Sequence, residues 1–344
     1  MDLFRRGSGV TAMTAALVLA AALASLPDPQ AKAATARVSA KTTATAPATV
    51  QARARPPVFA ALVERSRREH LVVGRLRRGA ASPSIFTFAE APNSGAFGPL
   101  AVSHSGTHVA FNFADSGDWV VAVIRTDGRG YRVLAHDAPT DHLVWSPDDS
   151  TIYFNLVSVP SGSRGSRGEH VWRVPVDGTG RPKQIVNSGH AVPTGIAHDG
   201  RWLALWIHNR HTEFGRCAII RTNGTHRRNV GPDNCGSPLW RPHAATLVTT
   251  RVIRSSRESL LTQQLWALYL RTGDYRVIPH VQPANQDGIA NALAWDRSGA
   301  FLYYMRCAPH SCAHYYRIRP DGTGKRDITP EFPSRLDDLV VQQG

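Results

Sequence analysis

The stretch LVWSPDDSTIYF at residues 143–154 decides how the rest of the sequence is interpreted. A short apolar run leads into a polar Ser-Pro-Asp-Asp-Ser segment, and a second apolar run follows it. Pro, Asp and Ser favour tight turns, and short apolar runs bounded by such residues are typical of strands. The stretch therefore predicts two antiparallel strands joined by a short turn.

Four degenerate copies of this stretch occur elsewhere in the chain. They read AVSHSGTHVAF, GIAHDGRWLAL, PLWRPHAATLV and LAWDRSGAFLYY, and begin at residues 101, 195, 238 and 293. The residues in register are Val102, Trp145, Ile196, Trp240 and Trp295, spaced 43, 51, 44 and 55 apart. A self-similar unit that recurs at roughly this interval is the sequence signature of a repeat architecture.

Each copy is followed by a second turn signal. The pairs are Asp127-Gly128, Asp177-Gly178, Asn223-Gly224, Thr272-Gly273 and Asp321-Gly322. Asp-Gly and Asn-Gly supply the positive φ that a tight hairpin needs, and strand-like runs flank each pair. Each repeat thus predicts four short strands. Such a unit cannot bury both of its faces alone, so the units must stack in a ring, which makes the chain an all-β β-propeller.

The Trp-Ser-Pro-Asp-Asp block, with its copies and trailing Asp-Gly-Thr-Gly turns, resembles the WD40-like repeat of the TolB family over roughly residues 95–335. This resemblance implies a propeller whose known relatives chiefly mediate protein contacts. We expect six blades of four antiparallel strands, with seven as the alternative. A closing blade would take its innermost strand from residues 336–343 and its outer strands from residues 70–76 and 84–90. The segment Val58–His70 is predicted to form one short amphipathic helix.

The N-terminal residues predict an export signal. Arg5 and Arg6 precede the apolar run Thr11–Leu26, and small-residue cleavage sites follow it. We therefore expect a signal peptide at residues 1–33, a flexible Ala/Thr/Pro/Arg-rich linker at 34–57, and the propeller at 58–344. The protein would be periplasmic or secreted; the alternative is anchoring by an uncleaved N-terminal segment.

The four cysteines are an even number in a chain predicted to be exported, which favours disulfides. Cys217 and Cys235 flank the hairpin at Asn223-Gly224, whereas Cys307 and Cys312 flank one short loop. We prefer the pairings 217–235 and 307–312 to the two other arrangements. A Cys/His metal site is the rival interpretation, but no CxxC spacing supports it.

Loop lengths vary most between the second and third strands of the repeats. Variable loops on a rigid ring are where binding usually resides. These loops are rich in arginine, whose planar guanidinium group suits carboxylate or phosphate. The whole chain has a formal net charge of +14, which also favours anionic partners. The candidate binding residues there are Arg210, Arg216, Arg254 and Arg257. The alternative is a solvated surface that binds nothing.

A second set of candidates lies in the connections between blades, which should converge on the mouth of the central channel. These residues are His142, His190, Asp287 and Asn291. They favour either a ligand site or polar side chains that line a wet channel. Trp145, Trp240 and Trp295 occupy the same place in their repeats, which predicts packing between blades rather than a ring of sugar-binding aromatics.

The sequence favours a binding module over an enzyme, because it has no G-x-S-x-G elbow, H-E-x-x-H pair or P-loop. We expect a monomer that binds an extracytoplasmic protein or peptide, without nucleic acid, cofactor or metal. Two other functions stay open: a lyase or hydrolase acting on a small or sugar substrate at the channel mouth, or a binder of anionic surface polymer.

Overall fold

The structure is a computed structural model and describes most of the chain from residue 58 onward. The described ranges are 58–65, 68–75, 86–87, 97–115, 118–157, 169–187, 190–208, 215–254, 261–281, 289–296, 298–308, 311–328 and 339–341. The predicted signal peptide and linker lie outside these ranges. Within them, no helix has the length and apolar character needed to cross a bilayer.

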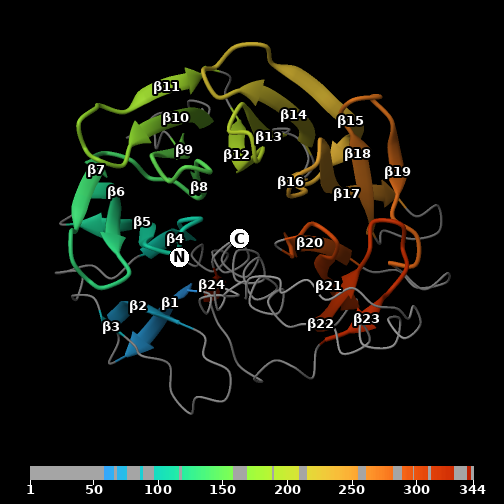
Figure 1. The fold of residues 1–344 in the computed structure, drawn as a ribbon, viewed down its shortest axis with the longest axis horizontal. Helices are drawn as coiled ribbons and strands as arrows, with labels where there is room; N and C mark the ends of the chain where they lie inside the picture. Colours follow the sequence, from blue (N-terminus) through green and yellow to red (C-terminus); the bar gives the residue numbers. More distant parts are fainter. Residues whose placement is uncertain are drawn as a thin grey trace, which may run out of the picture.

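In chain order the described strands fall into antiparallel groups of four around a central axis (Figure 1). Four of these groups are separate sheets, whereas the third and fourth are joined by a pair between Cys235 and Arg251 into one eight-stranded sheet. The first two groups, each from the innermost strand outward, are β4 (Phe97–Val102), β5 (His108–Asp115), β6 (Asp118–Arg125) and β7 (Arg132–Ala135), then β8 (Leu143–Trp145), β9 (Thr151–Val157), β10 (Glu169–Pro175) and β11 (Lys183–Val186). The next two are β12 (Ala191–Ile196), β13 (Trp202–His208), β14 (Gly215–Arg221) and β15 (Arg228–Cys235), then β16 (Leu239–Trp240), β17 (Thr246–Arg254), β18 (Leu261–Tyr269) and β19 (Tyr275–Val277). The fifth is β20 (Ile289–Trp295), β21 (Leu302–Ala308), β22 (Ser311–Ile318) and β23 (Arg326–Asp327).

The last group joins the two ends of the described chain. Its order is β24 (Leu339–Val341), β1 (Val58–Arg65), β2 (Arg68–Arg75) and β3 (Phe86–Thr87), and Phe59 pairs with Val341. The prediction that both chain ends build one sheet is confirmed. This closure makes the architecture a β-propeller, as the sequence predicts. The strand groups fit six blades, but the blade count itself stays a prediction.

The predicted helix over Val58–His70 is wrong. Residues 58–65 form β1, which pairs along its whole length with β2, from Val58 opposite Arg75 to Arg65 opposite Arg68. The segment contains good helix formers such as Ala, Leu and Glu, but propensity is a weak preference that tertiary pairing overrides. Here the apolar run completes a sheet whose inner strand would otherwise lack a partner.

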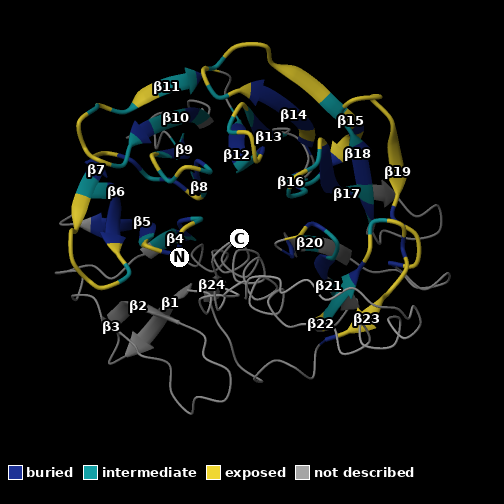
Figure 2. Cartoon of the chain, in the orientation of Figure 1, coloured by how far each residue is buried: buried dark blue, intermediate teal, exposed yellow. Residues whose placement is uncertain are grey.

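Strands in the middle of a group, such as β5 and β6, bury both of their faces, which is why they read as nearly continuous apolar runs. The outermost strands β15, β19 and β23 are largely exposed (Figure 2). On β5, Val109, Phe111 and Phe113 belong to one apolar cluster. Ala110 points the other way and packs in a second cluster, with Ile152 of the next group. The period-2 alternation of a strand thus places each blade between two neighbours, and the core consists of seams between blades.

The tryptophans of the repeat lie in these seams. Trp145, Trp240 and Trp295 are only 3%, 9% and 7% exposed, and each belongs to a cluster formed by two consecutive strand groups. The predicted packing role is confirmed for all three residues. Because they are buried, these three tryptophans do not offer exposed rings for a sugar to stack on.

Candidate functional site

The connections between strands divide the ring into two faces. We call the turn face the side that carries the first-to-second-strand turns and the third-to-fourth-strand hairpins. We call the loop face the opposite side, with the second-to-third-strand loops and the connections between groups. In the predicted hairpins of the turn face, the glycine has the positive φ that the sequence indicates, for example 81° at Gly128 and 89° at Gly224.

The structure describes only part of the predicted arginine site on the loop face. Arg210 and Arg257 lie outside the described residues, and Arg254 ends β17 with a side chain that is not described. Arg216 is the second residue of β14. Its Nε lies 3.2 Å from Oδ1 of Asp233, and both side chains are exposed. Arg216 therefore has an anionic neighbour that competes with any ligand, although an exposed pair of this kind is weak.

Two of the four predicted channel-mouth residues come close together. His142 precedes β8 and His190 precedes β12, and both lie on the loop face. Asp287 lies outside the described residues. The backbone of Asn291 is in β20 opposite Met305, and its side chain is not described. His142 and His190 both influence the pKa of His208, and a ligand role for the four residues stays a prediction.

The connection that carries His142 is held by two buried asparagines. Asn112 of β5 donates its amide to the carbonyl of Ala138 at 2.9 Å. Asn155 of β9 accepts the His142 backbone N–H at 3.1 Å, and its amide donates to the carboxylate of Asp141. Burial would raise the pKa of Asp141, but hydrogen bonds, chiefly from His142, hold it at about 2. This connection is therefore a fixed element that carries a permanent negative charge.

His208, at the end of β13, completes this neighbourhood. The backbone N–H of His208 donates to the carbonyl of His190 at 2.8 Å, and the imidazole packs on Trp206 with ring centroids 3.7 Å apart. Burial lowers the pKa of His208; Asp141 opposes the shift, whereas His142 and His190 add to it. The sequence did not single out Asp141 or His208. Among the side chains that the structure describes, no three His, Cys, Asp or Glu groups are placed to hold a metal ion.

A disulfide between Cys217 and Cys235 links β14 to β15, as predicted, with the two Cα atoms 6.0 Å apart. It bridges a part of the β14–β15 ladder where the register shifts. The Trp206 indole donates to the Cys235 carbonyl at 2.9 Å, which ties β13 to the same point. The disulfide indicates an oxidising compartment. Cys307 and Cys312 face each other in the β21–β22 register, but their side chains are not described, so this second bridge stays a prediction.

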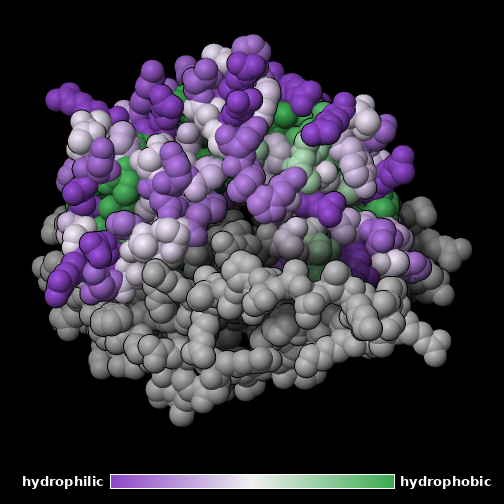
Figure 3. Space-filling model, in the orientation of Figure 1, coloured by the Kyte–Doolittle hydropathy of each residue, from purple (hydrophilic) through white to green (hydrophobic). Residues whose placement is uncertain are grey.

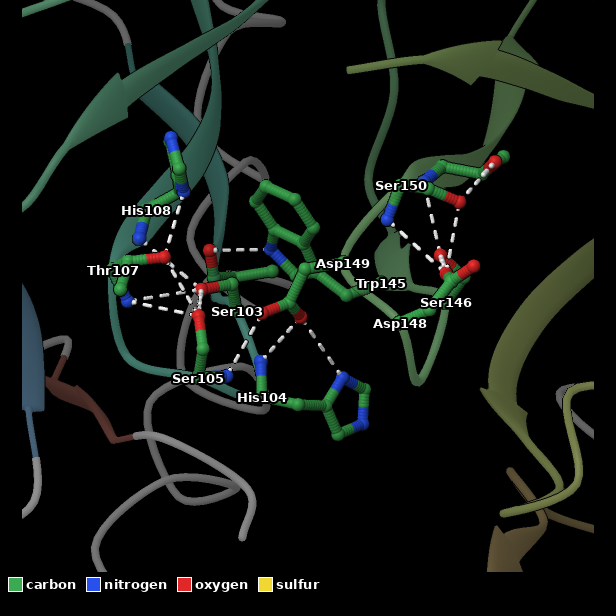
Figure 4. Close-up of polar contacts among 12 residues, drawn as sticks. Ser103, His104, Ser105, Thr107, His108, Trp145, Ser146, Asp148, Asp149 and Ser150 are labelled. Atoms are coloured by element: carbon green, nitrogen blue, oxygen red, sulfur yellow. Dashed lines mark hydrogen bonds and ion pairs between the residues drawn. The ribbon is translucent and has the colours of Figure 1, made fainter. Parts of the chain in front are cut away.

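On the turn face, the Asp149 carboxylate clasps the neighbouring blade (Figure 4). It accepts the backbone N–H of His104 at 2.7 Å and that of Ser105 at 2.9 Å, and the side chain is only 16% exposed. Trp145 reaches across the same seam and donates to the Ala101 carbonyl at 3.0 Å. Asp149 has φ 58°, in the left-handed region that the equivalent Gly106 also occupies. The Trp-Ser-Pro-Asp-Asp block thus joins two blades through its side chains as well as forming a turn.

This clasp predicts a specific dependence on acid. Burial would raise the pKa of Asp149, but hydrogen bonds from His104 and Ser105 hold it at about 2, below its ordinary value of 3.8. A lowered pKa means that the carboxylate stabilises the fold above about pH 4, and that this contribution is lost as the pH falls through 2. We expect Asp149→Asn to lower the melting temperature at pH 7, and the difference from the wild type to shrink as the pH approaches 2.

The measurement is a series of thermal melts from pH 7 to pH 2 on the wild type and the variant. Asn tolerates the left-handed backbone, so the substitution tests the charge and its hydrogen bonds. Asp141 is present in both proteins and cancels in the comparison. Asp177→Asn, at an exposed hairpin, is the control and should have a smaller effect. A difference that stays constant down to pH 2 would rule out the clasp.

Comparisons with known proteins support the fold. No protein-family model matches the sequence, and no curated protein matches it significantly. Among solved structures, TolB from Acinetobacter baumannii aligns with a TM-score of 0.56 at 10% identity, over 84% of this chain and 67% of that one. A prolyl oligopeptidase B from Galerina marginata gives 0.57 at 11% identity, over 81% of this chain and 45% of that one. A chain of a nidogen/laminin complex gives 0.50 at 13% identity, over 84% and 99%.

These neighbours include a chain of a protein complex and a prolyl oligopeptidase, so at such low identity they support the architecture and not an activity. They agree with the resemblance carried by the Trp-Ser-Pro-Asp-Asp repeat and with the ring of antiparallel strand groups. The chain is a β-propeller, and its fold is similar to that of TolB.

Proposed function

We propose that this protein is exported and docks an extracytoplasmic protein or peptide through its loop face. The disulfide between Cys217 and Cys235 supports a compartment outside the cytosol, in line with the predicted signal peptide. Among proteins of similar fold, the nidogen/laminin complex is an example of a propeller found with a protein partner. The destination, periplasm or medium, belongs to this proposal.

The observation that carries the proposal is a set of loops of different length on a fixed base. Only two residues separate β5 from β6, whereas residues 158–168 separate β9 from β10. Beneath the 209–214 loop, β13, β14 and β15 are tied together by the disulfide and by the Trp206 hydrogen bond. A fixed base lowers the entropy cost of binding, because less of the surface must be ordered when the partner arrives.

The arginines of these loops are the residues we assign to the partner. Replacing Arg210, Arg216, Arg254 and Arg257 together by Glu should abolish capture of the partner from the native cell envelope. Reversed charge both removes the forks that bind carboxylates and repels an acidic partner surface. The measurement is affinity capture with the mature chain, followed by mass spectrometry of the retained proteins, at low and physiological salt.

The matched control reverses charges on the turn face instead, at Arg181 and Lys183 of the β10–β11 hairpin. This control should still capture the partner. Equal capture by the loop-face variant and the wild type would place the docking surface elsewhere. Retention that vanishes at physiological salt would favour an anionic polymer as the ligand, because exposed charge contacts are strongly screened there.

A further inference from the structure

The turn face holds a groove that the proposed docking function does not use. It lies on the β16–β19 group and has a volume of about 590 Å³, within the usual range for ligand sites. The residues of its lining that the argument uses are His243, Tyr269, Arg271, Thr272, Asp274 and Arg276. Its remaining walls are small, because Ala244 and Ala245 leave room between the first turn and the β18–β19 hairpin.

The two arginines of the groove differ from Arg132 and Arg241 on the same face. Arg132 and Arg241 donate to carbonyls of neighbouring blades, at Val176 and Gly299. In contrast, Arg271 and Arg276 are exposed and make no hydrogen bond or ion pair with any residue that the structure describes. Their guanidinium groups are therefore available to a ligand, and the planar fork of each suits a carboxylate.

The backbone at His243 is unusual for this repeat. In the equivalent turns the left-handed residue is the fourth, as at Gly106, Gly200 and Gly299. In Arg241-Pro242-His243-Ala244 the third residue is left-handed, with φ 56° at His243. Pro at the second position with positive φ at the third describes a type II turn, which favours Gly or Asn at that third position. This turn sets the place of the His243 imidazole, which lines the groove and packs edge-on against His198.

The groove also offers groups that accept hydrogen bonds. The Asp274 carboxylate has no ion-pair partner among the described residues. Thr272 contributes a hydroxyl and Tyr269 an aromatic ring beside it. A ligand made only of acidic groups would leave Asp274 opposed by like charge. A sugar acid provides both a carboxylate for the arginines and hydroxyl donors for Asp274.

We propose that this groove binds a short acidic oligosaccharide, with a carboxylate held by Arg271 and Arg276 and ring hydroxyls held by Asp274 and His243. The site is separate from the loop face and stands independently of the docking function proposed above. It predicts selectivity for sugars that carry carboxylates over neutral sugars of the same length.

Titration calorimetry of the full chain at low salt tests this site with three probes: trigalacturonic acid, maltotriose and hexaglutamate. We expect binding of trigalacturonic acid, none of maltotriose, and at least tenfold weaker binding of hexaglutamate. Arg271→Gln with Arg276→Gln should weaken binding of trigalacturonic acid at least tenfold. Arg181→Gln with Lys183→Gln removes the same charge from another hairpin and should leave that binding unchanged.

His243→Gly provides a variant that should not unfold, since Gly is favoured at this turn position. We expect its melting temperature to equal or exceed that of the wild type, while binding of trigalacturonic acid weakens severalfold. Absence of binding by the wild type, or equal binding by the double arginine variant, would overturn the site. Equal or tighter binding of hexaglutamate would overturn the assignment to a saccharide.

Discussion

Trp145→Ala will lower the free energy of unfolding by about 3–5 kcal/mol, the usual cost of truncating a buried tryptophan. The indole is 3% exposed and packs with Ala110, Val121 and Ile152 in the seam between two blades. The neighbouring sheets are each held by their own hydrogen-bonded ladders, so they cannot easily collapse into the cavity. Urea denaturation followed by fluorescence and circular dichroism measures the effect.

A comparison among tryptophans separates packing from hydrogen bonding. Trp145 donates its indole N–H to Ala101, whereas the buried Nε1 atoms of Trp240 and Trp295 have no partner among the described residues. Trp145→Phe should therefore cost about 1 kcal/mol more than Trp240→Phe, since only the former breaks a hydrogen bond. Val277→Ala, at a position that is 41% exposed, is the control for a small effect. A loss below 1 kcal/mol for Trp145→Ala would mean that the indole does not form part of the seam.

Replacing Cys217 and Cys235 together by Ala will destabilise the protein by about 3 kcal/mol, as chain entropy predicts for a bridge across 18 residues. The corresponding fall in melting temperature is roughly 5 °C, because the unfolding entropy of a domain of this size is about 0.6 kcal/mol/K. The loss of stability should be largest at the base of the 209–214 loop. There the β14–β15 register shifts, and β15 pairs with β17 between Cys235 and Arg251. Calorimetry gives the global effect and amide hydrogen exchange locates it.

Cys307→Ala with Cys312→Ala is the natural comparison. If these residues form the predicted second bridge, it closes a much shorter loop, and chain entropy then predicts a smaller loss of about 2 kcal/mol. Partner capture by the Cys217/Cys235 variant should weaken together with the loop base. An unchanged melting temperature in that variant would show that the ladders alone hold this corner of the ring.

The sequence is most informative where one residue type has one structural use. Trp145 and its repeats predicted blade packing, the Asp-Gly turns predicted hairpins, and the two chain ends predicted a shared sheet. Each of these follows from local pattern plus the need to bury both faces of a strand. For residues 58–65 the local pattern predicts the wrong element. Their composition suits a helix, and only pairing with β2 and β24 makes them a strand.

The candidate sites were harder to predict, because they depend on which turns become neighbours in space. In the sequence, Asp149 is an ordinary turn residue. Its hydrogen bond with the backbone of His104 exists only because the two turns are neighbours in the ring. Asp141 and His208 are far apart in sequence and influence each other only because consecutive blades meet at the loop face. The groove at Arg271 and Arg276 arises from the changed turn at His243, a backbone difference of one position that the residue pattern does not reveal.

The pairing of β24 with β1 has a consequence for the order of folding. Phe59 and Val341 meet across about 280 residues, and closing a loop of that length costs roughly 5 kcal/mol of chain entropy. The ring therefore has a high contact order, and its final sheet cannot form before β24 has been synthesised. Until then the nascent chain presents an open arc whose two outermost blades each leave one apolar side exposed to water and to chaperones.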